Sequence, residues 1–181
     1  MHEHVNRRDR ASSRRAVFLE VAYKLHAKDV YTIALRLLAD ERAAEEVTVS
    51  VFVEFGRNPP RWWDEPEITT RLRELAIAEA LGRMRERIRD ALRRNEQERL
   101  LTQESQETQG SGLAREPLSR AMMSELVNQL PDHLRAVFVL HDLEGVSAEG
   151  VAGHLRIDEP TISKLISQAR LRLRSLWRAK V

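Results

Sequence analysis

Apolar residues recur at intervals of three and four through most of this chain, and no stretch alternates apolar with polar residues as a half-buried β-strand does. Two adjacent prolines, Pro59 and Pro60, interrupt the helical spacing, since proline restricts the backbone and donates no hydrogen bond. The pattern predicts an all-α protein. Before residue 95 we expect helices over three stretches: Val17 to Leu38, about Ala43 to Phe55 and about Ile68 to Arg94.

Residues 95–118 break the helical pattern. They are rich in Glu, Gln, Ser, Thr and Gly and contain few large apolar residues. A segment of this composition cannot bury enough apolar surface to fold, which is typical of a flexible linker. We therefore expect two small helical domains, residues 17–94 and 119–181, with a basic flexible arm at residues 1–16.

The second domain ends in the pattern of a helix-turn-helix. Ser147 suits the N-cap of a short helix, the sequence Arg156-Ile157-Asp158 suits a tight turn, and Pro160 is tolerated in the first turn of a longer final helix. That helix has apolar residues on one face and polar and basic residues on the other. In a helix-turn-helix the second helix enters the major groove of DNA.

Positive charge is concentrated in two short stretches, although the formal net charge of the chain is only +2. The stretch from Arg83 to Arg94 contains six arginines and only two acidic residues, Glu86 and Asp90. The residues from Thr161 to the C-terminus include six basic residues and no acidic one. Clustered cations of this kind attract a polyanion, so these two stretches are the candidates for binding nucleic acid.

The sequence offers no enzyme site. It has no cysteine, no histidine pair with metal-ligand spacing and no glycine-rich phosphate loop, so we expect no catalytic residue, no cofactor and no metal. No apolar run approaches the roughly 18 residues that cross a bilayer, and the basic N-terminus lacks an apolar signal segment. We therefore expect a cytoplasmic protein without membrane insertion.

Two segments of the chain resemble a known family. The stretch LVNQLPDHLRAVFVLHDLEGVSAEGVAGHLRIDEPTISKLISQARLRLRSLW is similar to the promoter-reading C-terminal domain of extracytoplasmic-function sigma factors, the sigma-70-like subunits of bacterial RNA polymerase. Its landmarks are the leucine-proline start, Leu-Glu-Gly before the serine cap, Thr161-Ile162 and Ala169-Arg170. The stretch VYTIALRLLADERAAEEVTVSVFVEF resembles the first half of the family's N-terminal domain.

The resemblance implies a sigma factor that directs RNA polymerase core to promoters for transcription initiation. Its N-terminal domain would bind the beta-prime clamp helices and open the minus-ten element, and its C-terminal domain would bind the minus-thirty-five element and the beta flap. An anti-sigma factor is a further partner of the kind this family has. The matched core-polymerase-binding positions are Glu45, Glu46, Val49 and Phe52.

The DNA-binding candidates fall into three groups. The residues expected at the minus-thirty-five groove are Thr161, Ser163, Lys164, Ser167 and Gln168, with Arg170 and Arg172 on flanking phosphates. The residues expected on phosphates near the melted region are Arg83, Arg85, Arg87 and Arg89. In the loop between the second and third helices, Trp62 and Trp63 are candidates for stacking on an unpaired base, although one of them packing the loop onto the core is the alternative.

Departures from the family pattern keep other functions open. Val49 and Ser50 stand where the family usually has Gln and Glu, and Ala78 and Gly82 stand where the promoter-melting helix usually has Asn and Asp. One alternative is a sigma-like DNA-binding regulator, or a decoy for an anti-sigma factor, that has lost promoter melting. Another is a helical adaptor whose arginines only keep it soluble.

Overall fold

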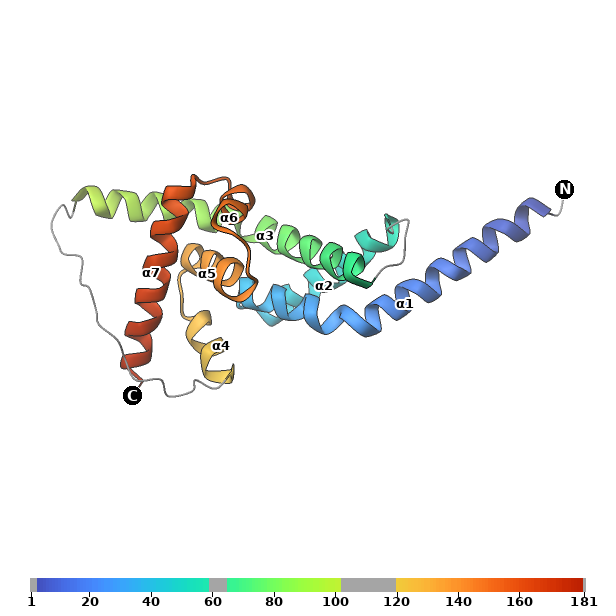
Figure 1. The fold of residues 1–181 in the computed structure, drawn as a ribbon, viewed down its shortest axis with the longest axis horizontal. Helices are drawn as coiled ribbons and strands as arrows, with labels where there is room; N and C mark the ends of the chain where they lie inside the picture. Colours follow the sequence, from blue (N-terminus) through green and yellow to red (C-terminus); the bar gives the residue numbers. More distant parts are fainter. Residues whose placement is uncertain (1–2, 59–64, 102–119, 181) are drawn as a thin grey trace. The chain divides into compact units, whose positions relative to one another are not determined.

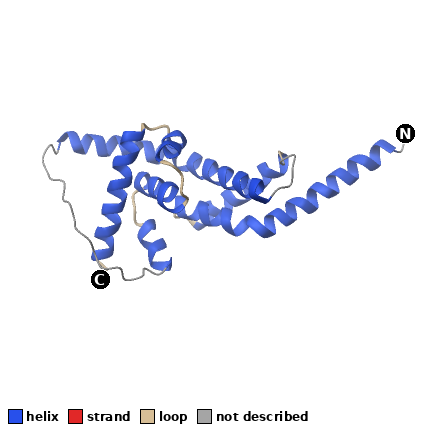
Figure 2. Ribbon diagram, in the orientation of Figure 1, coloured by secondary structure: helices blue, strands red, loops and turns tan. Residues whose placement is uncertain are grey.

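The computed structural model describes residues 3–58, 65–101 and 120–180, and the side chains of 15–58, 65–94 and 121–180. Every regular element in these ranges is a helix, which confirms the predicted all-α class (Figure 2). None of these helices carries an apolar stretch long enough to cross a membrane. The contacts divide the chain into two compact units, which we call unit 1 (Met1–Gly82) and unit 2 (Arg83–Val181).

The helix bounds differ from the predicted ones at both ends of the N-terminal region. Helix α1 (Glu3–Leu38) includes most of the residues predicted as a flexible arm, and α3 (Glu65–Leu101) continues past residue 94. The division between the units by their contacts falls after Gly82, inside α3. Residues 102–119, which make up most of that linker, lie outside the described residues, as do Trp62 and Trp63.

Unit 1 is built on a helical hairpin of α1 and α2 (Glu41–Arg57) (Figure 1). Ala39 takes a left-handed conformation with φ of 53°, which reverses the chain between the two helices. Asp40 then caps α2, because its carboxylate accepts a hydrogen bond of 2.9 Å from the Ala43 amide. The left-handed Ala39 and the Asp40 cap thus form this turn without a glycine.

The sequence marks an apolar stripe on α1 that consists of Val17, Val21, Leu25, Val30, Ile33, Ala34, Leu37 and Leu38. From Val30 onwards this stripe is buried as predicted, but its first three residues are not. Val17, Val21 and Leu25 are exposed, whereas Ala22 and His26 are buried. The buried positions continue along α1 with spacings of three and four, as one helix face requires. A histidine and an alanine gave too weak an apolar signal to mark that face. The remaining buried residues of α1 are Val30, Ile33, Ala34, Leu37 and Leu38.

Unit 2 is arranged around one central helix. Its elements after α3 are α4 (Arg120–Asn128), α5 (Asp132–Phe138), the π-helical turn η1 (Val139–Leu143), α6 (Ala148–Leu155) and α7 (Glu159–Arg178). All residues from His133 to Leu140 are buried, and a helix that is buried all round lies at the centre of its domain. Helix α7 packs against α4, α5 and α6 (Figure 1).

Candidate nucleic-acid interface

The α6–α7 junction has the geometry of a helix-turn-helix. The Ser147 hydroxyl caps α6 by accepting a hydrogen bond of 3.1 Å from the Gly150 amide, which confirms the predicted N-cap. Arg156 ends α6 in a left-handed conformation with φ of 58°, and the next amide, of Ile157, donates to the Ala152 carbonyl. The chain thus turns within three residues, as the sequence predicts.

Helix α7 begins at a capped turn. The Asp158 carboxylate accepts a hydrogen bond of 2.9 Å from the Thr161 amide, and Pro160 occupies the first turn. The pKa of Asp158 is lowered, first because the Thr161 side chain and then its amide hydrogen-bond to the charged carboxylate, with Lys164 nearby adding to the effect. Thr161 is half-buried and its side chain serves this cap, so its clearest role is to start the helix.

The remaining groove candidates lie together on the outer face of α7. Ser163, Lys164 and Ser167 are exposed and Gln168 is half-exposed, while the opposite face is buried. The Ser167 hydroxyl donates a hydrogen bond of 3.1 Å to the Ser163 carbonyl, and its oxygen can still accept one. The buried face of α7 consists of Ile162, Leu165, Ile166, Ala169 and Leu173.

Arg170 has an internal partner that the sequence did not reveal. Its Nε lies 3.2 Å from one carboxylate oxygen of Asp142 and its Nη2 contacts the other, so the pair is bidentate. The pKa of Arg170 is raised, chiefly by this hydrogen bond. Because Asp142 belongs to η1, the pair fastens that turn to α7. Arg170 was predicted to hold a DNA phosphate; in this structure it holds Asp142, and Arg172 is the exposed cation beside it.

A second internal arginine supports the centre of unit 2. Arg135 is only 5% exposed, and its guanidinium donates to the Leu130 carbonyl at 2.9 Å and contacts the Asp132 carboxylate. Burial lowers the pKa of Arg135, and the neighbouring Asp132 opposes that effect. The other oxygen of Asp132 lies 3.2 Å from Nε of Arg87 on α3. Arg135 therefore fixes the end of α4 to the start of α5.

The four α3 arginines do not form one strip. All four are exposed, but at 100° per residue Arg83 and Arg87 lie on one side of the helix and Arg85 and Arg89 lie about 200° away. The buried residue Met84 lies between the two pairs. A single phosphate backbone can follow only one of these sides, so the predicted set separates into two pairs.

The candidates on α2 separate by burial. Glu45, Glu46 and Val49 are exposed on the outer face of the helix. Phe52 is 5% exposed and packs edge-to-face against Tyr23, with ring centroids 4.9 Å apart. The Phe52 ring therefore lies inside unit 1, where it supports α2, and its part in shaping the polymerase-binding helix stays a prediction.

Sequence reasoning missed three residues that matter here. Asp142 and Arg135 look like surface charges in the sequence, because their partners become visible only in the fold. Val53 is 46% exposed one turn beyond Val49, so α2 presents an apolar pair at its surface. The sequence places Val47, Val51, Phe52 and Phe55 on one side of this helix, and that side is buried. The spacing of four residues between Val49 and Val53 could therefore have found the exposed pair.

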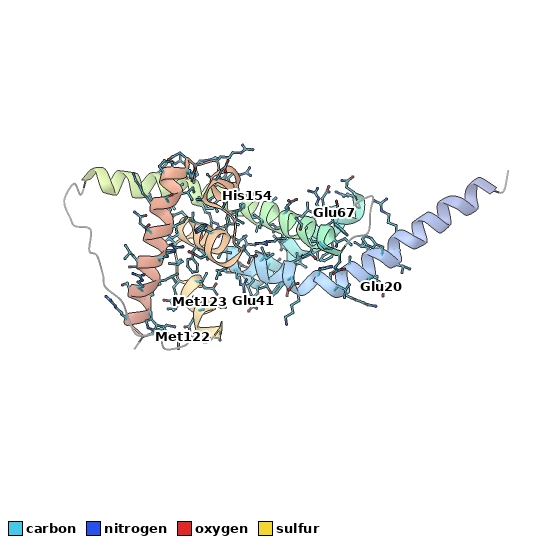
Figure 3. All side chains as sticks on the ribbon, in the orientation of Figure 1. Glu20, Glu41, Glu67, Met122, Met123 and His154 are labelled. Carbon is cyan, nitrogen blue, oxygen red and sulfur yellow. The ribbon has the colours of Figure 1, made fainter. Side chains whose placement is uncertain are left out.

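Other chemistry finds no support in the part of the chain that the structure describes. Within that part no group of three or more His, Cys, Asp or Glu side chains could hold a metal ion. Figure 3 shows the described side chains as sticks on the helices, with Met122 and Met123 labelled on α4 and His154 on α6. The strongest cluster of functional features is the helix-turn-helix of unit 2.

Comparisons with known proteins agree with that emphasis. Residues 120–173 match the family model for sigma-70, region 4. The fold is similar to that of the sigma factor RpoE in its co-crystal structure with the anti-sigma factor NepR from Bartonella quintana, with a TM-score of 0.55 and 18% sequence identity. That match covers 88% of this chain and 96% of the other. A search of curated proteins gives no significant match.

Proposed function

We propose, on the premise that residues 120–173 form a sigma-70 region 4 domain, that this protein is a sigma factor directing RNA polymerase core to specific promoters. Helix α7 would lie in the major groove of the minus-thirty-five element. The observation that carries the proposal is its outer face, where Ser163, Lys164 and Ser167 are exposed on a helix that has no acidic residue after Glu159. Such a face suits base edges flanked by phosphates.

Unit 1 and the part of α3 that belongs to unit 2 would contribute the other contacts of a sigma factor. Exposed Glu45, Glu46 and Val49 on α2 are the surface proposed for the beta-prime clamp helices. On α3, the pair Arg85 and Arg89 is the side proposed for phosphates near the minus-ten element. Arg87, on the other side of α3, is paired with Asp132 within unit 2. Transcription initiation places this function in the cytoplasm.

In vitro transcription tests the proposal. The full chain with core polymerase from the source organism is offered its genomic DNA, and the expected result is a set of transcripts that share an upstream motif. Lys164→Ala should lower promoter binding severalfold, whereas Arg178→Ala, an exposed cation of α7 about 21 Å further along the helix, should change it less. Transcription that is the same with and without the chain would contradict the proposal.

A second candidate function follows from the surface of α2. Val49 and Val53 are 58% and 46% exposed, and two neighbouring apolar side chains favour a protein partner. The chain would then be a sigma-like DNA-binding regulator or a decoy for an anti-sigma factor, and the RpoE of the comparison is itself seen with an anti-sigma factor. A pull-down with core polymerase at low salt separates the two functions. Failure to bind core while still binding DNA would favour the second.

A further inference from the structure

One large apolar side chain lies in the middle of the polar face of α7. Leu171 is 51% exposed, the most exposed of the large apolar residues described in unit 2. At 100° per residue it lies close to the direction opposite the buried face of the helix. The packing of α7 against the rest of unit 2 therefore does not account for a leucine at this position.

The spacing joins Leu171 to the proposed groove residues. Lys164, Ser167, Gln168 and Leu171 follow one another at i, i+3, i+4 and i+7, so they form one strip along the helix. The distance from Lys164 to Leu171 along the axis is about 10 Å, which corresponds to about three base-pair steps of 3.4 Å. A helix lying in the groove through Lys164 can thus bring Leu171 over a base a few steps away.

The charged residues around Leu171 are basic, so they can bind DNA phosphates while Leu171 contacts a base. Arg172 and Arg174 are exposed next to it, and no acidic residue follows Glu159 on α7. Arg170, the residue directly before Leu171, is turned towards Asp142. Cations at the sides of the strip can hold phosphates while its centre stays apolar.

We propose that Leu171 is a specificity-determining residue that contacts the methyl group of a thymine in the major groove. This inference rests on the proposed function and names a contact within it. Thymine is the base whose major-groove edge carries an apolar group, the C5 methyl, and an aliphatic side chain is its natural complement. The promoter would therefore have a preferred thymine at the position that faces Leu171.

Replacing thymine by deoxyuridine tests this contact, because the substitution removes only the methyl group. Holoenzyme made with the full chain first enriches duplexes from a random pool, and each thymine of the resulting motif is then replaced in turn. At one position the wild-type protein should bind about fourfold more weakly, the effect of one buried methyl-sized group. Leu171→Ala should bind the thymine and deoxyuridine duplexes equally at that position.

A matched variant completes the experiment. Leu143→Ala removes an exposed leucine of unit 2 that lies outside α7, and it should retain the full deoxyuridine penalty. If every deoxyuridine penalty of the wild type persists in Leu171→Ala, the inference is overturned while the proposed function stands. If the holoenzyme enriches no common sequence, the proposed function itself fails.

Discussion

The two units differ in what their interiors are made of. Unit 1 is held by apolar and aromatic packing, with Phe18 against Phe55 and Tyr23 against Phe52. Unit 2 instead encloses a guanidinium, that of Arg135, at its centre. A buried charge is tolerated only when all its partners are in place. Its main effect is therefore to require one arrangement of those partners, while its net contribution to the free energy of unfolding is small.

This difference matches the surfaces of the two units. Unit 1 has exposed apolar residues on both helices of its hairpin, including Val21 and Val49, which suits protein partners. Unit 2 has a cationic face on a helix that internal ion pairs hold in place. The function proposed for this face, reading DNA, would need side chains at fixed positions, and polar contacts inside unit 2 fix them.

Substituting the aromatic core tests the apolar half of the comparison with the largest expected effect. Phe55→Ala removes a ring that is 1% exposed, which should lower the free energy of unfolding of unit 1 by about 4 kcal/mol. Hydrogen exchange read by mass spectrometry, peptide by peptide, distinguishes α1 and α2 from the helices of unit 2. Val49→Ala is the matched surface control, with an expected change below about 0.5 kcal/mol.

Removing the buried guanidinium tests the polar half. Arg135→Ala should destabilise unit 2 by about 3 kcal/mol, because the Leu130 carbonyl and the Asp132 carboxylate lose their partner. The loss is measured by hydrogen exchange in α4 and α5, with exposed Arg172→Ala as the control. A loss under about 1 kcal/mol would break the comparison, since the charge would then be replaceable at little cost.

The pair Arg170–Asp142 offers a way to separate a stabilising cation from a proposed DNA-binding one, Arg172. Arg170→Ala should lower the stability of unit 2 by about 1 kcal/mol, as expected for a partly exposed bidentate pair. Arg172→Ala should leave stability unchanged and reduce the slope of log affinity against log salt by about one. Thermal unfolding and DNA titration at several salt concentrations measure the two effects. A reversal, in which Arg172→Ala unfolds the domain, would contradict this assignment.

Substitutions at the left-handed turns should change the free energy of unfolding by a smaller amount in both units. Ala39 and Arg156 adopt positive φ, which costs a residue with a side chain about 1–2 kcal/mol relative to glycine. Ala39→Gly and Arg156→Gly should each raise the free energy of unfolding by up to about 1 kcal/mol, after the greater freedom of glycine in the unfolded chain is counted. Lower melting temperatures for both would show that these residues make contacts beyond the turn.

The sequence was sufficient for features that local chemistry determines. The cap of Ser147, the three-residue turn and the helical start at Asp158 all follow from neighbouring residues, and all are present. The sequence was not sufficient where a contact depends on residues far apart in the chain. The partner of Arg170 is 28 positions away, and the buried face of α1 runs through His26, which lies 3.3 Å from Glu65 of α3.

A pH titration completes the comparison, because the structure buries His133 at the centre of unit 2. Its Nδ1 has no hydrogen-bond partner among the described residues, and burial lowers its pKa from 6.5, with Asp132 opposing the shift and Arg94 adding to it. The folded domain therefore binds a proton less readily than the unfolded chain.

Stability of unit 2 should then be greatest above the unfolded pKa of 6.5 and should fall as the pH falls below that value towards the lowered folded pKa. His133→Leu, which keeps an apolar side chain of similar volume, should remove this part of the pH dependence. Unit 1 is the internal reference, since the substitution lies outside it. Urea unfolding between pH 7.5 and about 5, followed by hydrogen exchange in each unit, gives the measurement. If wild type and variant lose stability in parallel over this range, groups other than His133 carry the pH dependence. The burial of His133 would then not make the pH dependence of unit 2 differ from that of unit 1.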